Sequence, residues 1–180
     1  LEIIDGMEMD LQQTRYLDFK ALSLYCYRVA SVVGLLAAEI FGYTDRQTLK
    51  YAHDLGMAFQ LTNIIRDVGE DARRGRVYLP LDELKRFDVP VADILNARHS
   101  ENFRRLMEFQ IERAEGYYAQ AMSQLPEADR KAQRPGLVMA AIYRTLLDEI
   151  KRDGCQVLNQ RTSLTPLRKL WIAWRTWIRG

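Results

Sequence analysis

The chain has 180 residues, of which 48% are hydrophobic and 28% charged, with 10 Gly and 5 Pro. This length suits one domain with a sizeable core, and the composition excludes disordered and collagen-like chains. The net charge of +2 gives no indication of nucleic-acid binding. The two cysteines, Cys26 and Cys155, exclude a disulfide framework and a cysteine zinc site. They favour a reducing compartment, so we expect a cytoplasmic protein.

Helical periodicity with few breakers predicts an all-α protein with a single domain over residues 1–180. Asp18 and Ser100 are predicted to begin helices, and Gly42 to end one. The predicted elements are helices over 18–41 and 45–71, a loop over 72–80, short helices over 81–87 and 91–96, and helices over 100–125, 136–152 and from 166 onward.

Two features concern membranes and the chain start. The longest mostly apolar run, residues 29–38, is shorter than the ~18 residues of a transmembrane helix, so we expect no membrane span. The sequence begins Leu-Glu-Ile-Ile-Asp, without an initiator Met or a signal sequence. We therefore expect the chain to be an internal piece of a longer product.

Polar residues form one stripe along the predicted helix over 45–71. At 100° per residue, six positions fall within about 100° of arc. They are Gly56, Gln60, Asn63, Asp67, Glu70 and Asp71. The rest of this helix is apolar, which indicates burial. A solvated face is the ordinary explanation of a polar stripe. Because buried polar groups without partners are costly, we interpret this one as the lining of an occupied cavity.

Asp67 and Asp71 lie four residues apart, which places their carboxylates on one helix face about 5–6 Å apart at Cβ. Two bare carboxylates repel, so a bound cation is expected. Oxygen ligands without nearby His or Cys favour Mg²⁺ or Mn²⁺ over zinc, and Mg²⁺ completes its coordination with water and phosphate oxygens. The expected ligand is therefore phosphorylated, and the arginines between residues 66 and 76 can bind further phosphate oxygens.

Several stretches resemble the squalene/phytoene synthase family. The string QLTNIIRDVGED at 60–71, followed by GRVYLP at 75–80, is similar to that family's second aspartate-rich region. The segment YCYRVASVVG at 25–34 resembles its YCxxVAxxVG motif. Further similar stretches are DGMEMD at 5–10, AIYRTLLDEI at 141–150 and RTSL at 161–164. The resemblance covers nearly the whole chain. Residues 31–32, 34–36 and 40–42 resemble bacterial presqualene diphosphate (squalene) synthases more than phytoene synthases.

The resemblance implies head-to-head condensation of two prenyl diphosphates inside an isoprenoid-synthase-type helical bundle around a central cavity. Magnesium ions on two aspartate-rich motifs ionise the donor, and the acceptor's double bond attacks the allylic cation to give a cyclopropylcarbinyl diphosphate. Carried onto this sequence, the resemblance makes Asp67, Asp71 and Asn63 metal ligands, Asn63, Gln60, Arg66 and Tyr143 contacts to the diphosphate or to the metal ligands, and Tyr25 the candidate for proton transfer during ring closure.

Small apolar side chains form a face on the helix that contains Tyr25. They recur at i, i+3 and i+4 spacing and are Cys26, Val29, Ala30, Val33, Gly34 and Ala37. Close helix packing is the ordinary use of such a face. Beside the polar stripe, with Gly56 at its apolar end, we interpret it as a slot for a prenyl tail lined by Val29, Val33 and Gly34. Tyr25 itself is equally explained as a core tyrosine with a satisfied hydroxyl.

The family's first aspartate-rich motif has no counterpart in this sequence. Asp5 and Asp10 do not reproduce its context, and the other acids before Asp45 are isolated. Only part of the metal array can then form, so we expect an N-terminally incomplete bundle that is inactive in isolation.

The last sixteen residues, 165–180, combine Trp171, Trp174 and Trp177 with Arg168, Lys169, Arg175 and Arg179, without an acidic residue. This pattern is typical of an interfacial helix on anionic lipid, which favours peripheral contact with the inner face of the cytoplasmic membrane. Docking onto the protein's own core is an equal alternative.

The leading prediction is a Mg²⁺-dependent prenyltransferase that condenses two molecules of farnesyl diphosphate to presqualene diphosphate, on the route to squalene or hopanoids. One alternative is a phytoene synthase acting on geranylgeranyl diphosphate. Another is an inactive relative that acts in assembly, which the presence of Asp67, Asp71 and Asn63 disfavours. No nucleotide-binding loop supports NADPH-dependent reduction, and the sequence indicates no oligomeric state.

Overall fold

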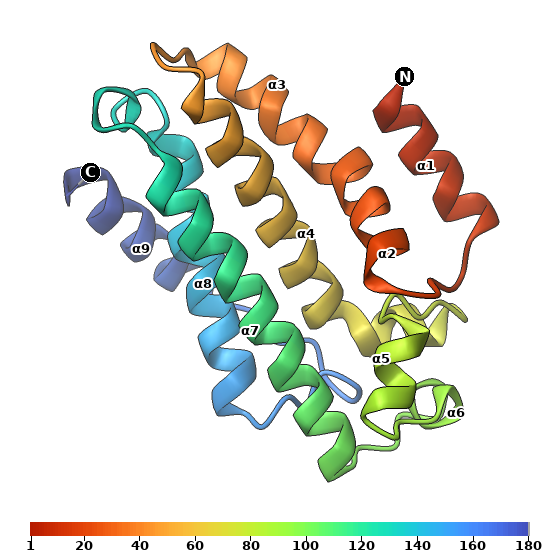
Figure 1. Ribbon diagram of the computed structural model, residues 1–180. Coiled ribbons are helices and arrows are strands. Elements are labelled where there is room, and N and C mark those ends of the chain that lie inside the picture. The colour runs from red at the N-terminus through yellow and green to blue at the C-terminus, as the bar shows by residue number, and fades with distance from the viewer. Residues whose placement is uncertain (180) are drawn as a thin grey trace.

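The computed structural model describes residues 1–179, with side chains to residue 178, and shows an assembly of helices (Figure 1). Within these residues the sole β contact is an isolated bridge between Arg15 and Val77, so the predicted all-α class is confirmed. The elements are α1 (Glu2–Gln12), α2 (Phe19–Cys26), the π-helical turn η1 (Tyr27–Ser31), α3 (Val32–Phe41), α4 (Gln47–Arg73), α5 (Leu81–Arg86), α6 (Val91–Leu95), α7 (Glu101–Gln124), the 3₁₀ turn η2 (Glu127–Asp129), α8 (Arg134–Arg152) and α9 (Pro166–Arg179).

The predicted helix ends are confirmed where local chemistry sets them. The Asp18 carboxylate accepts a hydrogen bond from the Ala21 amide at 2.8 Å, and the Ser100 hydroxyl accepts one from the Phe103 amide at 3.1 Å. Gly42 ends α3 with φ +83°, a conformation that glycine adopts without steric cost. No helix is predicted at α1, which contains a central glycine and exposes most of its apolar side chains.

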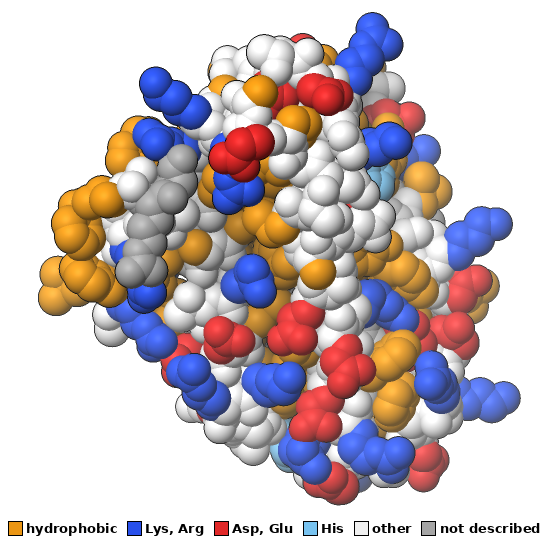
Figure 2. Space-filling view, turned by 60° about the vertical axis from the view of Figure 1, so that its left-hand side comes forward, with side chains coloured by type: hydrophobic (Ala, Val, Ile, Leu, Met, Phe, Trp, Pro, Cys, Tyr) orange, Lys and Arg blue, Asp and Glu red, His pale blue; other side chains and the backbone are white. Residues whose placement is uncertain are grey.

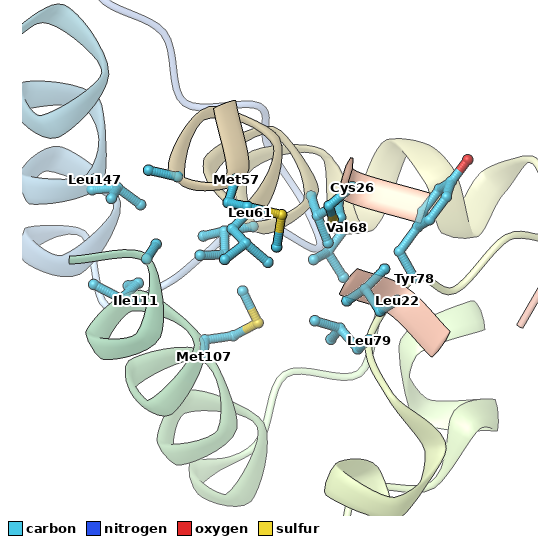
Figure 3. Packing of buried hydrophobic residues seen from close by; sticks show 14 of the residues in the cluster. Leu22, Cys26, Met57, Leu61, Val68, Tyr78, Leu79, Met107, Ile111 and Leu147 are labelled. Atoms are coloured by element: carbon cyan, nitrogen blue, oxygen red, sulfur yellow. The ribbon is translucent and has the colours of Figure 1, made fainter. Parts of the chain in front are cut away.

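Helix α4 is the central element, in contact with α2, η1 and α3, with α7 and with α8 (Figure 1). Most of its side chains are buried, which confirms the prediction that this helix lies inside the protein. Figure 3 shows Met57, Leu61 and Val68 of α4 between Leu22 and Cys26 of α2 and Met107 and Ile111 of α7. The fold therefore holds the polar stripe of α4 within a mainly apolar surrounding.

Glycines set the distance between α4 and the helix before it. A Cβ added to Gly56 would lie 2.7 Å from the Cα of Ser31, and one added to Gly34 would lie 2.6 Å from the carbonyl oxygen of Ala52. The Ser31 hydroxyl, at the end of η1, donates to the His53 carbonyl at 2.9 Å. The small-residue face therefore packs helices closely, as its ordinary explanation predicts.

Helices α2 and α3 join through η1 into one helical rod over Phe19–Phe41. The most apolar 18-residue window of this rod has a mean hydropathy of 1.6 and is 28% buried, so by length and composition alone the rod could cross a membrane. The sequence analysis considered only residues 29–38, whereas the π turn continues the helix without a break, so the apolar helix is longer than expected. The absence of a membrane span stays a prediction. One side of the rod packs on α4, and Leu36 and Ile40 are exposed on α3.

Substituting Gly56 with Ala tests the close crossing. Because the new methyl group would overlap the backbone of η1, we expect Gly56→Ala to lower the free energy of unfolding by about 1–3 kcal/mol. Gly116→Ala on α7 is the matched control, since no atom lies within 4 Å of its Cβ position. It should raise stability by about 0.5–1 kcal/mol. Urea unfolding followed by circular dichroism measures both, and equal effects at the two positions would contradict the packing explanation.

Candidate active site

A pocket of about 350 Å³ lies between η1, α3 and α4, with the start of α8 as a further wall. Its wall is mainly apolar, and Gln60 and Asn63 supply its polar end. Six residues proposed from the sequence line it together: Val29, Val33, Gly34, Gly56, Gln60 and Asn63. Gly34 of the small-residue face therefore packs against α4 and also lines the pocket, and the use of this face as a slot for a prenyl tail stays a prediction.

The pocket contains polar atoms that no protein group satisfies. The Oδ1 atom of Asn63 and the hydroxyl of Tyr51 are buried without a hydrogen-bond partner among the described residues. An unpaired buried polar group is costly, so both atoms indicate a place for a bound molecule. Asp67 follows Asn63 after one helical turn, a rise of about 6 Å. The polar end of the pocket thus continues towards the aspartates.

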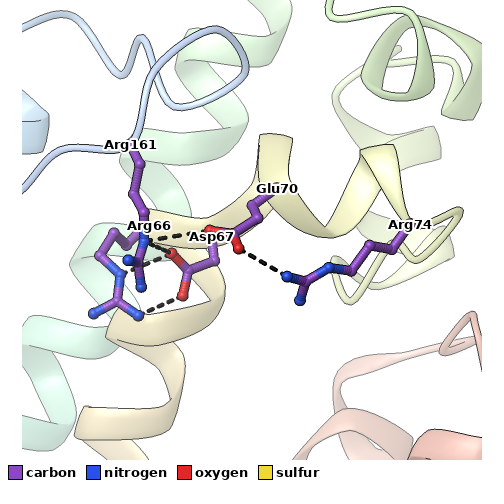
Figure 4. A network of polar contacts seen from close by, with 5 residues as sticks. All are labelled: Arg66, Asp67, Glu70, Arg74 and Arg161. Atoms are coloured by element: carbon purple, nitrogen blue, oxygen red, sulfur yellow. Dashed lines mark hydrogen bonds and ion pairs between the residues drawn. The ribbon is translucent and has the colours of Figure 1, made fainter.

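Asp67 is the centre of a polar network on α4 (Figure 4). Its carboxylate accepts a hydrogen bond from Arg66 Nε at 2.8 Å and another from Arg161 Nε at 2.8 Å, and Arg66 also forms a second, shorter contact. Arg161 Nε also lies 3.4 Å from Glu70, and Glu70 accepts from Arg74 at 2.9 Å. Burial by itself raises the pKa of Asp67, but the two arginines outweigh it and lower that pKa.

Arg161 belongs to this network although it was not among the predicted site residues. It lies 94 positions after Asp67, and only the fold brings the two together. The approach depends on Gly69, whose amide donates to the Val157 carbonyl at 3.2 Å. A Cβ at Gly69 would overlap the carbonyl oxygens of Val157 and Leu158. The RTSL segment at 161–164 was the available signal, because it matched the family pattern.

Asp71 lies one turn beyond Asp67 in a different environment. It lines a small cavity together with Arg76 and Tyr78. Burial raises the pKa of Asp71 to about 6, and the negative charge of Asp67 adds to the effect. The two carboxylates of the motif therefore have opposite pKa shifts. Arginines lower the pKa of Asp67, whereas too little positive charge lies near Asp71 to offset its burial.

The donor set can be compared with what Mg²⁺ requires. Among the residues described, no three His, Cys, Asp or Glu side chains are grouped in a way that could hold a metal ion. Asp71, Asp67 and the unpaired Asn63 oxygen nevertheless form an oxygen-only set on one face of α4. Mg²⁺ often binds one or two carboxylates and takes its remaining ligands from water and phosphate. These residues therefore fit a metal shared with a phosphorylated ligand.

Tyr25 lies outside the pocket lining. Its ring is buried in a cluster with Tyr16 and Tyr78, at centroid distances of 5.6 and 5.4 Å. Its hydroxyl donates to Asp10 at 3.0 Å, and the Tyr78 hydroxyl donates to the other oxygen of Asp10 at 2.7 Å. Burial, with added repulsion from Tyr78 and Asp10, raises the pKa of Tyr25, which keeps its hydroxyl protonated. A catalytic role for Tyr25 stays a prediction.

Asp10 was also not among the predicted site residues, and it joins α1 to the Asp71 side of α4. Arg76, which follows the aspartate-rich helix, donates to the Asp10 carbonyl at 2.9 Å. The segment DGMEMD at 5–10 carried the only sequence signal for Asp10.

Tyr143 on α8, predicted as a diphosphate contact, lies against Phe59 of the pocket at a centroid distance of 5.0 Å. The hydrogen bond from Arg66 to Asp67 is the largest cause of the raised pKa of Arg66, and Tyr143 adds to that shift.

Comparison with known proteins assigns this arrangement. The profile of the squalene/phytoene synthase family matches residues 1–168. The chain belongs to the squalene/phytoene synthase family. Members of this family act on prenyl diphosphates and in general depend on divalent metal ions. The predicted family and fold are therefore confirmed.

Individual relatives refine the comparison. The chain is 42% identical to phytoene synthase of Arthrospira platensis, over 94% of this chain and 59% of the relative. It is 39% identical to chloroplastic phytoene synthase 3 of Zea mays, over 99% and 43%. A crystal structure of a dehydrosqualene synthase in complex with ligand superposes with a TM-score of 0.84 at 28% identity, over 97% of this chain and 62% of that one. The chain spans about half the length of these curated relatives.

The prediction of a presqualene diphosphate synthase using farnesyl diphosphate is wrong. The similar curated relatives are named phytoene synthases, whereas squalene synthase HpnC from Alicyclobacillus acidocaldarius is 24% identical over 85% of this chain and 58% of that one, with a TM-score of 0.76. The structure gives a physical reason for the error. Ser31 is set by the crossing with α4, and Leu36 and Ile40 are exposed, so these positions report helix packing and surface rather than substrate.

The raised pKa of Asp71 predicts a pH dependence. Between pH 4 and 6 the folded state binds more protons than the unfolded state, so this group lowers stability as pH rises through that range. We expect the gain in stability from Asp71→Asn to be about 1–2 kcal/mol larger at pH 7 than at pH 4. Urea unfolding in buffer with EDTA measures it. Asp82→Asn on exposed α5 is the control, and a gain independent of pH would contradict the assignment.

Proposed function

We propose that this chain carries the second aspartate-rich half of a phytoene synthase, which condenses two molecules of geranylgeranyl diphosphate head-to-head. The observation that supports it most is the pocket, whose apolar wall ends at Asn63 one turn before Asp67. A prenyl chain needs such an apolar wall, and a diphosphate needs such a polar end. The names of the relatives favour the longer C20 substrate.

In this proposal the chain's own residues bind the substrate, orient it and exclude water. Val29, Val33 and Gly34 line the prenyl chain, and the apolar wall shields a carbocation from water. Gln60 and the unpaired oxygen of Asn63 lie where the prenyl chain would end and the diphosphate begin. Arg66 and Arg161 supply guanidinium groups beside Asp67 that can bind diphosphate oxygens.

Asp67, Asp71 and Asn63 would hold Mg²⁺, with Mn²⁺ as a substitute. The bound ion supplies charge stabilisation of the departing diphosphate. To act as a metal ligand, Asp67 would give up at least one of its two arginine contacts, and the released Arg66 or Arg161 would then bind diphosphate oxygens. The tyrosine pair on Asp10 would hold a proton at the Tyr25 hydroxyl, one turn before the Val29 wall.

The same proposal includes the cellular location. A C20 substrate and a larger hydrocarbon product partition into lipid, so a peripheral position on the cytoplasmic face of a membrane suits this reaction.

Calorimetry with a non-hydrolysable geranylgeranyl thiodiphosphate tests the function. We expect binding that requires Mg²⁺ and that is at least about tenfold tighter than for the C15 analogue, because the longer analogue adds one C5 unit and burying each further carbon contributes up to ~0.8 kcal/mol. Asp67→Asn should weaken Mg²⁺-dependent binding by about 10- to 100-fold, the size of a lost charged contact.

Asp82→Asn on α5 removes an equivalent charge away from the pocket and should leave binding unchanged. Binding that is independent of both Mg²⁺ and Asp67 would contradict the proposed site. Equal affinity for the C15 and C20 analogues would contradict the proposed substrate.

A further inference from the structure

Helix α9 presents its apolar side away from the rest of the protein. At 100° per residue, six large apolar residues fall within about 120° of arc. They are Leu167, Leu170, Trp171, Trp174, Trp177 and Ile178, and each is more than half exposed. Ile172, Ala173 and Thr176, which are partly buried, lie on the opposite side. In a helix that docks on its own core these two sides would be reversed.

Polar and small contacts hold α9 to α8. Arg168 donates to Glu149 at 2.7 Å, Ile172 packs against the core, and the Arg134 guanidinium lies 5.6 Å from the centre of the Trp177 ring. The tryptophans Trp171 and Trp174 pack on each other at 5.1 Å. The exposed apolar surface is therefore a fixed feature of the fold. Figure 2 shows hydrophobic side chains protruding at its left edge, bordered by Lys and Arg side chains.

Positive charge accompanies this surface. Helix α9 has no Asp or Glu, and no ion pair is found for Lys169 or Arg175 within the described residues. Beneath the helix a groove of about 430 Å³ lies between α8 and α9. Arg130, Arg144 and Arg175 surround it, and its floor includes Leu137 and Ala140. An apolar floor with an arginine rim fits a lipid, with acyl carbon on the floor and phosphate at the rim.

We propose that α9 lies in the plane of an anionic lipid bilayer, with its tryptophans in the interface and Arg175 at the phosphates. Tryptophan prefers this region because its ring is apolar and its N–H is polar. This inference rests on the proposed function only for the reason why the protein would bind a membrane. Pro135 and Gly136 at the start of α8 line the prenyl pocket, and their neighbour Arg134 contacts Trp177, so a docked α9 places the pocket beside the membrane.

Tryptophan fluorescence is a direct probe, because all three tryptophans of the chain lie in α9. The full chain is titrated with vesicles of phosphatidylcholine alone and of phosphatidylcholine with 30 mol% phosphatidylglycerol. We expect a blue shift, and quenching by brominated lipid, at about 100-fold lower lipid concentration with the anionic vesicles. Arg175→Glu should weaken that binding about 20-fold, while Arg105→Glu on α7 should leave it unchanged.

A second pair of variants tests the apolar side, with binding measured by vesicle co-sedimentation. Trp171→Gln with Trp174→Gln should weaken binding at least about tenfold. Leu36→Gln with Ile40→Gln removes a matched exposed apolar pair from α3 and should not weaken it. Circular dichroism checks that each variant is folded.

Three outcomes would overturn the proposal. The first is equal binding to both vesicle types, and the second is loss of binding only in the α3 pair. The third is that the chain does not bind vesicles and instead forms a dimer, which the tryptophan substitutions dissociate. The last would assign the surface to a second copy of the chain. Because vesicle binding needs neither substrate nor Mg²⁺, its failure leaves the calorimetric test of the proposed function intact.

Discussion

The structure depends on the close approach of three segments to α4, and glycine makes each approach possible. Gly34 and Gly56 let η1 and α3 lie against α4, and Gly69 lets the carbonyls of residues 157–158 reach it. Each contact is backbone against backbone, so a side chain would force the elements apart. The first two contacts form a wall of the apolar pocket, and the third places Arg161 on Asp67.

The two aspartates of the motif show how one helix can create two electrostatic environments. Asp67 faces Arg66 and Arg161 and is held ionised, whereas Asp71 lies one turn further among fewer compensating charges and its pKa is raised. Like charges four residues apart cannot both be well stabilised without a cation. The arrangement is therefore suited to a ligand that brings positive and negative charge together, as a metal diphosphate does.

Apolar surface lies both inside the protein and on its outside. The pocket takes apolar carbon inside the protein, while α9 keeps its large apolar side chains outside and is attached by Arg168 and Ile172. Arg134 and its neighbours on α8 connect the two regions. The protein thus has both an interior and an exterior apolar surface, joined by the start of one helix, as the proposed lipid substrates and the proposed membrane contact require.

The sequence by itself determined the all-α class, most helix ends, the family, and the gathering of Gln60, Asn63 and Asp67 on one face, because helical geometry fixes which neighbours within a few turns share a side. It did not determine the partners of that face. Arg161 contacts Asp67 from 94 positions away and Asp10 contacts Arg76 from 66 positions away, and helical periodicity predicts no contacts at such separations. The tertiary structure alone decided which side of α9 faces outward. An amphipathic period shows that a helix has two sides, and only packing chooses between them.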